Sequence, residues 1–211
     1  MRSLRHYLVR IPKRFKDTIQ VGEKELYLDA KFNEFQHRFM EGEVIAIPEK
    51  FKVPVSVGDT LYFHHHVVIE PPQVIDKEKD IYYVTINPEE PILSQAYAFK
   101  SKETGEISPL QNWVFIKPVE QEAEFKSNIL HIYREKEDPN KEGEIAFDSE
   151  AVIDLGLKKG DRVFFQRDAD YEMELDGNKY WRMNTSMLTY AKVHNDWCRS
   201  SVADFYGDSY R

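Results

Sequence analysis

The hydrophobic positions of this chain come in short runs that alternate with polar residues, which is the pattern of half-buried β-strands. The clearest region is 142–193, where Gly160-Asp161 forms a tight turn ahead of an apolar strand. Residues 171–175 alternate with period two, and Asp176-Gly177 is the strongest short hairpin signal before the returning strand at 180–183. These features predict a small, strongly turned β-barrel.

The same order of elements occurs earlier in the chain. Three elements follow one another at nearly constant separation in each half. They are a strand beginning Glu-Gly-Glu, a Gly-Asp turn that leads into an apolar strand, and a strand with two adjacent aromatic residues. They occupy residues 41–47, 57–63 and 81–84 in the first half, and 142–147, 159–165 and 180–183 in the second. An apolar strand ending in proline precedes each copy, at 7–12 and 113–118. Self-similarity at this long period predicts duplication of a whole domain.

The predicted fold class is therefore all-β, with two tandem small β-barrels that carry long loops. A chain of 211 residues is long enough for two domains of about 100 residues each. We expect the first, more divergent barrel in residues 1–100, a linker in 101–111, the second barrel in 112–193 and a C-terminal tail in 194–211. The linker assignment depends on Gly105 and Pro109 among polar residues.

Two loops are too long for ordinary hairpin connections, and loops of that length are usually functional or disordered. Each contains a short apolar segment, Leu26-Tyr27-Leu28 in the first and Ile129-Leu130-His131-Ile132 in the second. Exposed apolar segments of this kind indicate a partner surface. For the first segment, a strand packed on its own barrel is an equal alternative. The charged run 134–142 after the second cannot form a core and favours a binding role there.

Candidate sites for chemistry are few. On a strand, His64 and His66 would share one face and could meet one metal ion. A closed zinc site needs four ligands, and we interpret this triplet as a polar strand end. Cys198 and His194 lie in a tail without a catalytic scaffold, and no glycine loop precedes a helix to hold a nucleotide. We predict no catalytic residue, no metal and no cofactor, and hence no enzyme.

Composition narrows the class of partner. A net charge of −8 argues against nucleic acid and against an anionic membrane. No apolar run approaches the roughly 20 residues that span a bilayer, and the sequence begins with no signal peptide. Cys198 is the single cysteine, so an intramolecular disulfide is impossible, which favours a reducing cytoplasm.

The order of these elements resembles the GroES family of co-chaperonins. That order is a strand, a long polar loop, a Glu-Gly-Glu strand, a short insert, a Gly-Asp turn, an acidic hairpin and a closing strand. The resemblance covers about residues 5–193, is closer in the second copy, and is nearest to the phage-encoded branch with its short roof segment. The insert at 49–57 is too short for a roof hairpin, and its counterpart at 148–159 is only slightly longer, with room for one helical turn. The resemblance then implies a dome that is open or differently closed at its apex.

By this resemblance, the apolar segments take the place of the mobile-loop triad that docks on the apical domain of a GroEL-type chaperonin. The expected function is a non-enzymatic co-chaperonin that caps an ATP-dependent chaperonin ring, with ATP bound by the partner, and assists protein folding. His131 departs from the all-apolar pattern of that triad. The expected chaperonin-binding residues are Leu26, Tyr27, Leu28, Ile129, Leu130 and Ile132.

The alternative is a structural or scaffold protein, for instance in phage assembly, that reuses the barrel without binding a chaperonin. An enzyme of the alcohol dehydrogenase type is excluded because the chain has no dinucleotide-binding βαβ segment.

The resemblance also implies assembly, because the first strand of a GroES subunit pairs with the last strand of its neighbour. Within this chain we expect residues 95–99 to lie against residues 113–117. Strands at 7–11 and 187–193 then remain as free edges, which predicts a homo-oligomeric ring. The expected subunit interface consists of Leu8, Val9, Leu188 and Tyr190.

Overall fold

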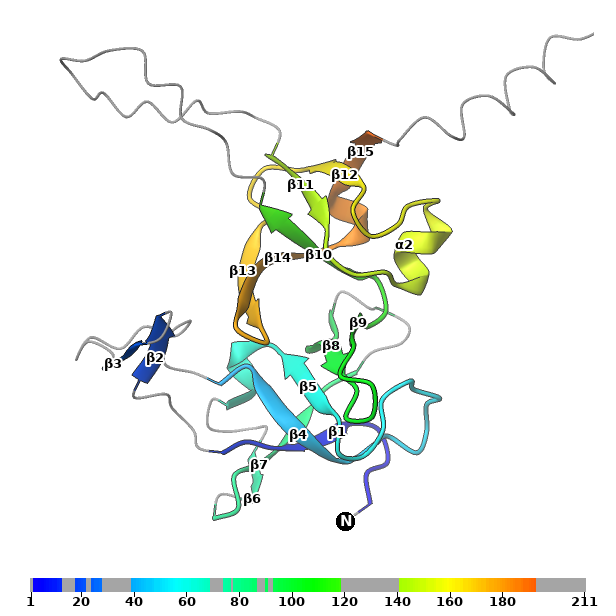
Figure 1. The fold of residues 1–211 in the computed structure, drawn as a ribbon. Coiled ribbons are helices and arrows are strands. Elements are labelled where there is room, and N and C mark those ends of the chain that lie inside the picture. The colour runs from blue at the N-terminus through cyan, green and yellow to red at the C-terminus, as the bar shows by residue number, and fades with distance from the viewer. Residues whose placement is uncertain are drawn as a thin grey trace, which may run out of the picture. The chain divides into compact units, whose positions relative to one another are not determined.

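The computed structural model describes residues 2–12, 18–21, 24–27, 39–68, 74–76, 78–86, 90, 93–118 and 141–192. The chain divides into two compact units, Met1–Trp113 and Val114–Arg211. Regular structure in the described residues is almost entirely β, in one seven-stranded, one six-stranded and one two-stranded sheet (Figure 1). The prediction of an all-β fold with two barrel-like domains is confirmed. None of the helices among these residues has the length and hydropathy to cross a bilayer.

The first unit is built on a seven-stranded sheet in the order β6-β7-β1-β4-β5-β8-β9. A separate hairpin consists of β2 and β3, and a 3-10 turn, η1, follows β5. The bounds are β1 Tyr7–Arg10, β2 Thr18–Val21, β3 Lys24–Tyr27, β4 Glu41–Ala46, β5 Thr60–Phe63, η1 His65–Val68, β6 Val74–Asp76, β7 Ile81–Val84, β8 Ala96–Lys100 and β9 Ile107–Pro109.

Period-two alternation places one face of each strand in the core of this unit. On the β1 side, Tyr7, Val9 and Ile11 are buried together, while Arg10 between them is exposed. Leu61 and Phe63 of β5 join the same cluster. The polar and apolar pattern of the sequence thus fixes which face of the sheet is inside.

The second unit contains a six-stranded sheet in the order β13-β14-β10-β11-β12-β15. The bounds are β10 Trp113–Pro118, β11 Lys141–Ile145, α2 Glu150–Asp154, β12 Arg162–Phe165, β13 Tyr171–Leu175, β14 Asn178–Asn184, η3 Thr185–Met187 and β15 Leu188–Lys192. The predicted Asp-Gly hairpin is confirmed, because Leu175 pairs with Asn178, and Asp176 and Gly177 both have positive φ, 52° and 77°.

The same turn leads into β5 and β12. The Gly58 N–H donates to the Val44 carbonyl at 2.8 Å, and the Val44 N–H donates to the Asp59 carbonyl at 2.8 Å. In the second unit, Gly160, Ile145 and Asp161 make the equivalent bonds at 2.9 and 3.0 Å. Gly58 and Gly160 have φ of 96° and 89°, which explains why glycine recurs at this position. This shared geometry supports the predicted duplication.

Both turns also bury the aspartate side chain. Asp59 accepts hydrogen bonds from the backbone N–H of Ser56 at 2.7 Å and of Lys102 at 3.0 Å. Asp161 accepts a bond of this kind from the N–H of Lys158 at 2.9 Å. Each buried carboxylate is therefore satisfied by backbone N–H donors of its own turn or of a neighbouring segment.

We expect Asp59→Ala to lower the free energy of unfolding of the first unit by roughly 2 kcal/mol, because two part-buried hydrogen bonds from backbone N–H groups to a carboxylate are lost. Asp161→Ala is expected to cost the second unit less. Urea denaturation of both variants checks this, with Asp154→Ala at an exposed position as the control. Equal stability of Asp59→Ala and the control would contradict the role assigned to the carboxylate.

The segment predicted as a linker contains β9, which pairs with β8 in the first sheet. The chain reverses through a tight turn in which the Gly105 N–H donates to the Ser101 carbonyl at 2.9 Å. Ala98 is then opposite Pro109 and Lys100 opposite Ile107. The expectation that residues 95–99 pair as a strand with residues 113–117 is wrong, because β5 and β9 take the two edges of β8. The two segments still touch at one point, where the rings of Tyr97 and Trp113 lie with their centres 4.8 Å apart.

The expectation that β1 is a free edge is also wrong. β1 lies between β7 and β4, so that Leu8 is opposite both Tyr83 and Ala46. Leu8 and Val9 are 4% and 0% exposed. Both backbone edges of β1 are therefore occupied by the chain itself, and Leu8 and Val9 are core residues of the first unit. The local pattern did not reveal that β7 returns to cover β1.

Candidate functional site

The first apolar segment lies on the β2–β3 hairpin, which forms a two-stranded sheet of its own (Figure 1). Ile19 is opposite Leu26 and Thr18 is opposite Tyr27. Leu26 is 48% exposed and Tyr27 is 88% exposed, so neither side chain is buried in the barrel core. The alternative of an ordinary strand packed on its own barrel does not apply to these two residues. Leu28 lies outside the described residues.

The second apolar segment, with Ile129, Leu130 and Ile132, lies outside the described residues. The structure does place the two ends of its loop, because Pro118 at the end of β10 is opposite Gly143 in β11. The first loop likewise leaves β1 and returns to β4, its antiparallel neighbour. Both predicted binding segments therefore belong to the loop that joins the same pair of strands in each unit.

The base of each loop is closed by the glycine of the Glu-Gly-Glu motif. A Cβ atom on Gly143 would lie 2.3 Å from Ile116 Cγ2 and 2.5 Å from the Lys117 carbonyl oxygen. A Cβ atom on Gly42 would lie 3.0 Å from the Arg10 carbonyl oxygen. The recurrence of glycine between two glutamates is the sequence signal for this close approach, although the signal alone does not show which atoms the glycine faces.

Ion pairs lie beside both loop bases. The Arg10 guanidinium donates to the Glu43 carboxylate at 2.6 Å, across the β1–β4 pair. In the second unit, the Lys141 ammonium donates to the Asp170 carboxylate, and its Nζ lies 5.9 Å from the centre of the Trp181 ring. The first pair is exposed and the second is partly buried, so each adds at most a small stabilisation to the strands from which the loops project.

The last strand, β15, is an edge of the six-stranded sheet as far as the structure describes it. Tyr190 is 51% exposed and stacks on Phe164, with ring centres 4.2 Å apart and an interplanar angle of 11°. Leu188 is half-buried and packs against the core of the unit. Of the four predicted interface residues, Leu188 and Tyr190 therefore lie on an edge strand, whereas Leu8 and Val9 do not.

Comparison with known proteins places this geometry in one family. The family model for the chaperonin 10 Kd subunit matches residues 106–190, a segment that begins just before β9 and ends within β15. The co-chaperonin GroES of Symbiobacterium thermophilum is 35% identical over 80 residues, which cover 35% of this chain and 82% of that protein. The co-chaperonin GroES of Alkaliphilus metalliredigens is 37% identical over 79 residues, covering 35% of this chain and 84% of its own length. The chain belongs to the GroES family of co-chaperonins.

Proposed function

We propose that this protein is a co-chaperonin, without enzymatic activity, that caps the ATP-dependent ring of a GroEL-type chaperonin and assists protein folding. The observation that carries the proposal is the exposed pair Leu26 and Tyr27 on a hairpin between β1 and β4, in a member of this family. The binding residues are Leu26, Tyr27, Leu28, Ile129, Leu130 and Ile132. ATP is bound by the partner, and the proposed location is the cytoplasm, that of the host if the gene is carried by a phage.

The proposed mechanism combines weak contacts. Each loop contributes a short apolar segment to a groove on the chaperonin and loses a few kcal/mol of conformational entropy when it is ordered. Several loops on one oligomer raise the combined avidity by orders of magnitude without strengthening any single contact. Because each contact stays weak, a nucleotide-driven change in the chaperonin groove is enough to release the whole cap.

Co-sedimentation with a GroEL-type chaperonin tests the proposal directly. The full chain is mixed with the chaperonin in the presence of ADP, in the presence of ATP and without nucleotide. We expect the protein to sediment with the chaperonin only when nucleotide is present, and to support refolding of a denatured client in that mixture. Absence of binding under all three conditions favours the alternative of a scaffold protein that reuses the barrel.

We further propose that the protein forms a homo-oligomer through β15. The antiparallel pair β5–β8 has a register shift between Tyr62 and Phe63, and the pair β12–β15 has one at the equivalent point, between Phe164 and Phe165. β8 in the first unit therefore corresponds to β15 in the second. The outer edge of β8 is covered by β9. By the same pattern, β15 is covered by a strand from a second copy, with Leu188 and Tyr190 at the contact. A ring of whole chains contains an even number of barrels, so it mismatches a seven-fold partner.

We expect a mass in solution of at least three chains of 25.0 kDa at micromolar concentration. Tyr190→Lys is expected to weaken the assembly at least about tenfold, since it removes an aromatic contact and adds a charge at the interface. Ile153→Lys, at a residue of α2 that is 62% exposed, is the control and leaves the mass unchanged. A stable wild-type monomer refutes the oligomer, while chaperonin binding by that monomer would leave the proposed function standing.

A further inference from the structure

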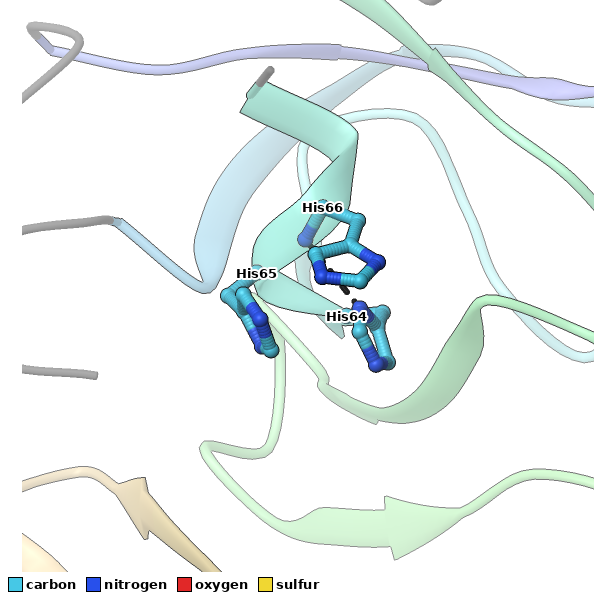
Figure 2. A group of neighbouring side chains, drawn as sticks. All are labelled: His64, His65 and His66. Carbon is cyan, nitrogen blue, oxygen red and sulfur yellow. Dashed lines mark hydrogen bonds between the residues drawn. The ribbon is translucent and has the colours of Figure 1, made fainter. Parts of the chain in front are cut away.

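Three consecutive histidines converge at the end of β5. Figure 2 shows the rings of His64, His65 and His66 grouped on one turn of the chain. The ring centres are 4.3 Å apart for His64 and His65, 4.4 Å for His64 and His66, and 4.2 Å for His65 and His66. Consecutive side chains of a strand point to opposite faces, so this grouping is not a property of a strand. It arises because β5 ends at Phe63 and the 3-10 turn η1 begins at His65.

The backbone that carries these rings is firmly held. The His64 N–H donates to the Gln95 carbonyl at 2.9 Å, and the His64 carbonyl accepts from the Val67 N–H at 2.9 Å. Val67 and Val68, the last two residues of η1, are fully buried in the core cluster of the first unit. The three imidazoles therefore project from a fixed turn, with His65 buried, His64 half-buried and His66 exposed.

Their nitrogen atoms are near the spacing that one shared ion requires, and the rings must also rotate, because those of His64 and His65 are stacked at an interplanar angle of 27° and a nitrogen lone pair lies in its ring plane. One ligand nitrogen from each ring lies within 4.8 Å of the other two. Two nitrogens on one ion, each about 2.1 Å from it, are at most about 4.2 Å apart, so the widest pair must close by about 0.6 Å or more. The half-buried His64 and the exposed His66 have room for this movement through rotation about their side-chain bonds.

A hydrogen bond defines the state of one donor. The backbone N–H of His66 donates to Nδ1 of His64 at 3.1 Å, so this nitrogen presents a lone pair and carries no proton (Figure 2). A metal ion also takes a lone pair from a neutral imidazole. This lone pair is engaged by the His66 N–H, so an ion bound at Nδ1 must displace that hydrogen bond.

We propose that His64, His65 and His66 form a binding site for a late first-row divalent metal ion, namely Ni²⁺, Cu²⁺ or Zn²⁺. Imidazole nitrogens suit these ions, whereas Mg²⁺ and Ca²⁺ require oxygen ligands. Three protein ligands leave at least one coordination position for water, on the side where His66 is exposed. A bound ion joins the end of β5 to η1 and stabilises the first unit. Among the described residues, this is the one group of three such side chains that meets the distance requirement.

Isothermal titration of the full chain with Ni²⁺ and with Zn²⁺ tests the site. His66→Ala removes the most exposed ligand, and His6→Ala is the matched control in the same unit, outside the group. Residues His37, His131 and His194 are present in all three proteins, so the difference between the variants isolates the triplet. We expect wild type and His6→Ala to bind alike and His66→Ala to lose one ion or at least about tenfold in affinity. Mg²⁺ should produce no binding heat.

Thermal unfolding gives an independent measurement. Saturating Ni²⁺ is expected to raise the melting temperature of the first unit by about 5 °C or more in wild type and in His6→Ala, because the ion binds the folded state. His66→Ala and His64→Gln should show no such rise. If all four proteins bind equal numbers of ions with equal affinity and shift equally, the binding is adventitious and the proposal is overturned. The outcome is independent of whether the protein binds a chaperonin.

Discussion

Gly143→Ala is expected to destabilise the second unit by about 3 kcal/mol, the upper end of the usual cost of overpacking, because one of the close contacts is with backbone. The added Cβ would meet Ile116 Cγ2 at 2.3 Å and the Lys117 carbonyl oxygen at 2.5 Å. Ile116 is fully buried and the carbonyl belongs to the backbone of β10, so neither can move aside cheaply. Urea denaturation followed by the fluorescence of Trp181, which contacts the core of this unit, measures the loss.

Gly42→Ala is the matched control, because it occupies the same position of the first Glu-Gly-Glu motif. There the added Cβ would lie 3.0 to 3.3 Å from its three nearest atoms, two of which belong to side chains. We expect a loss of about 1 kcal/mol, which the first unit tolerates. Equal losses in the two variants would show that the close approach of β10 and β11 does not set the requirement for glycine.

Charging the apolar loop segments is expected to abolish chaperonin binding. Tyr27→Asp and the double variant Ile129→Asp with Leu130→Asp each place a carboxylate where an apolar groove must accept the side chain, which is strongly unfavourable. The combined variant should lose at least about 100-fold in affinity, since the contacts act together. Co-sedimentation with the chaperonin in ADP measures the loss, and Ile153→Asp on α2 controls for a general effect of charge on the surface.

Thermal unfolding of the same variants separates binding from folding. Tyr27 is 88% exposed, so Tyr27→Asp should leave the melting temperature unchanged. Variants of Ile129 and Leu130 that unfold the protein yet leave residual binding intact would identify these residues as core, and the binding assignment would be wrong. Loss of binding in the double variant alone would assign the interaction to the second loop.

Local signals in the sequence predicted the elements well. The Asp176-Gly177 hairpin depends on two positive φ values at adjacent residues, and such chemistry is visible in the sequence itself. The Gly-Asp turns were found for the same reason, because Gly58 and Gly160 have backbone conformations that other residues resist. The pairing of strands distant in sequence was predicted less well, since β7 beside β1 and β9 on β8 are set by tertiary packing.

One candidate site was visible in the sequence, whereas the other depends on the fold. Leu26 and Tyr27 could be selected from composition alone, because an apolar pair among polar residues is informative wherever it lies. The grouping of three histidine rings could not, since it depends on where β5 changes to a 3-10 turn. On an ideal strand, His64 and His66 would share one face and His65 would point to the other. The 3-10 turn that begins at His65 instead brings all three rings together.

The cover that β9 provides for β8 has a consequence for the concentration at which an oligomer forms. The family match begins at residue 106, so β9 starts the homologous segment of the second barrel although it pairs with the first sheet. Such a contact is made within one chain, where the effective concentration of the two strands is in the millimolar range. In the proposed oligomer, dilution therefore separates the chains only at the β15 contacts, and the pairing of β9 with β8 survives in every chain that is released.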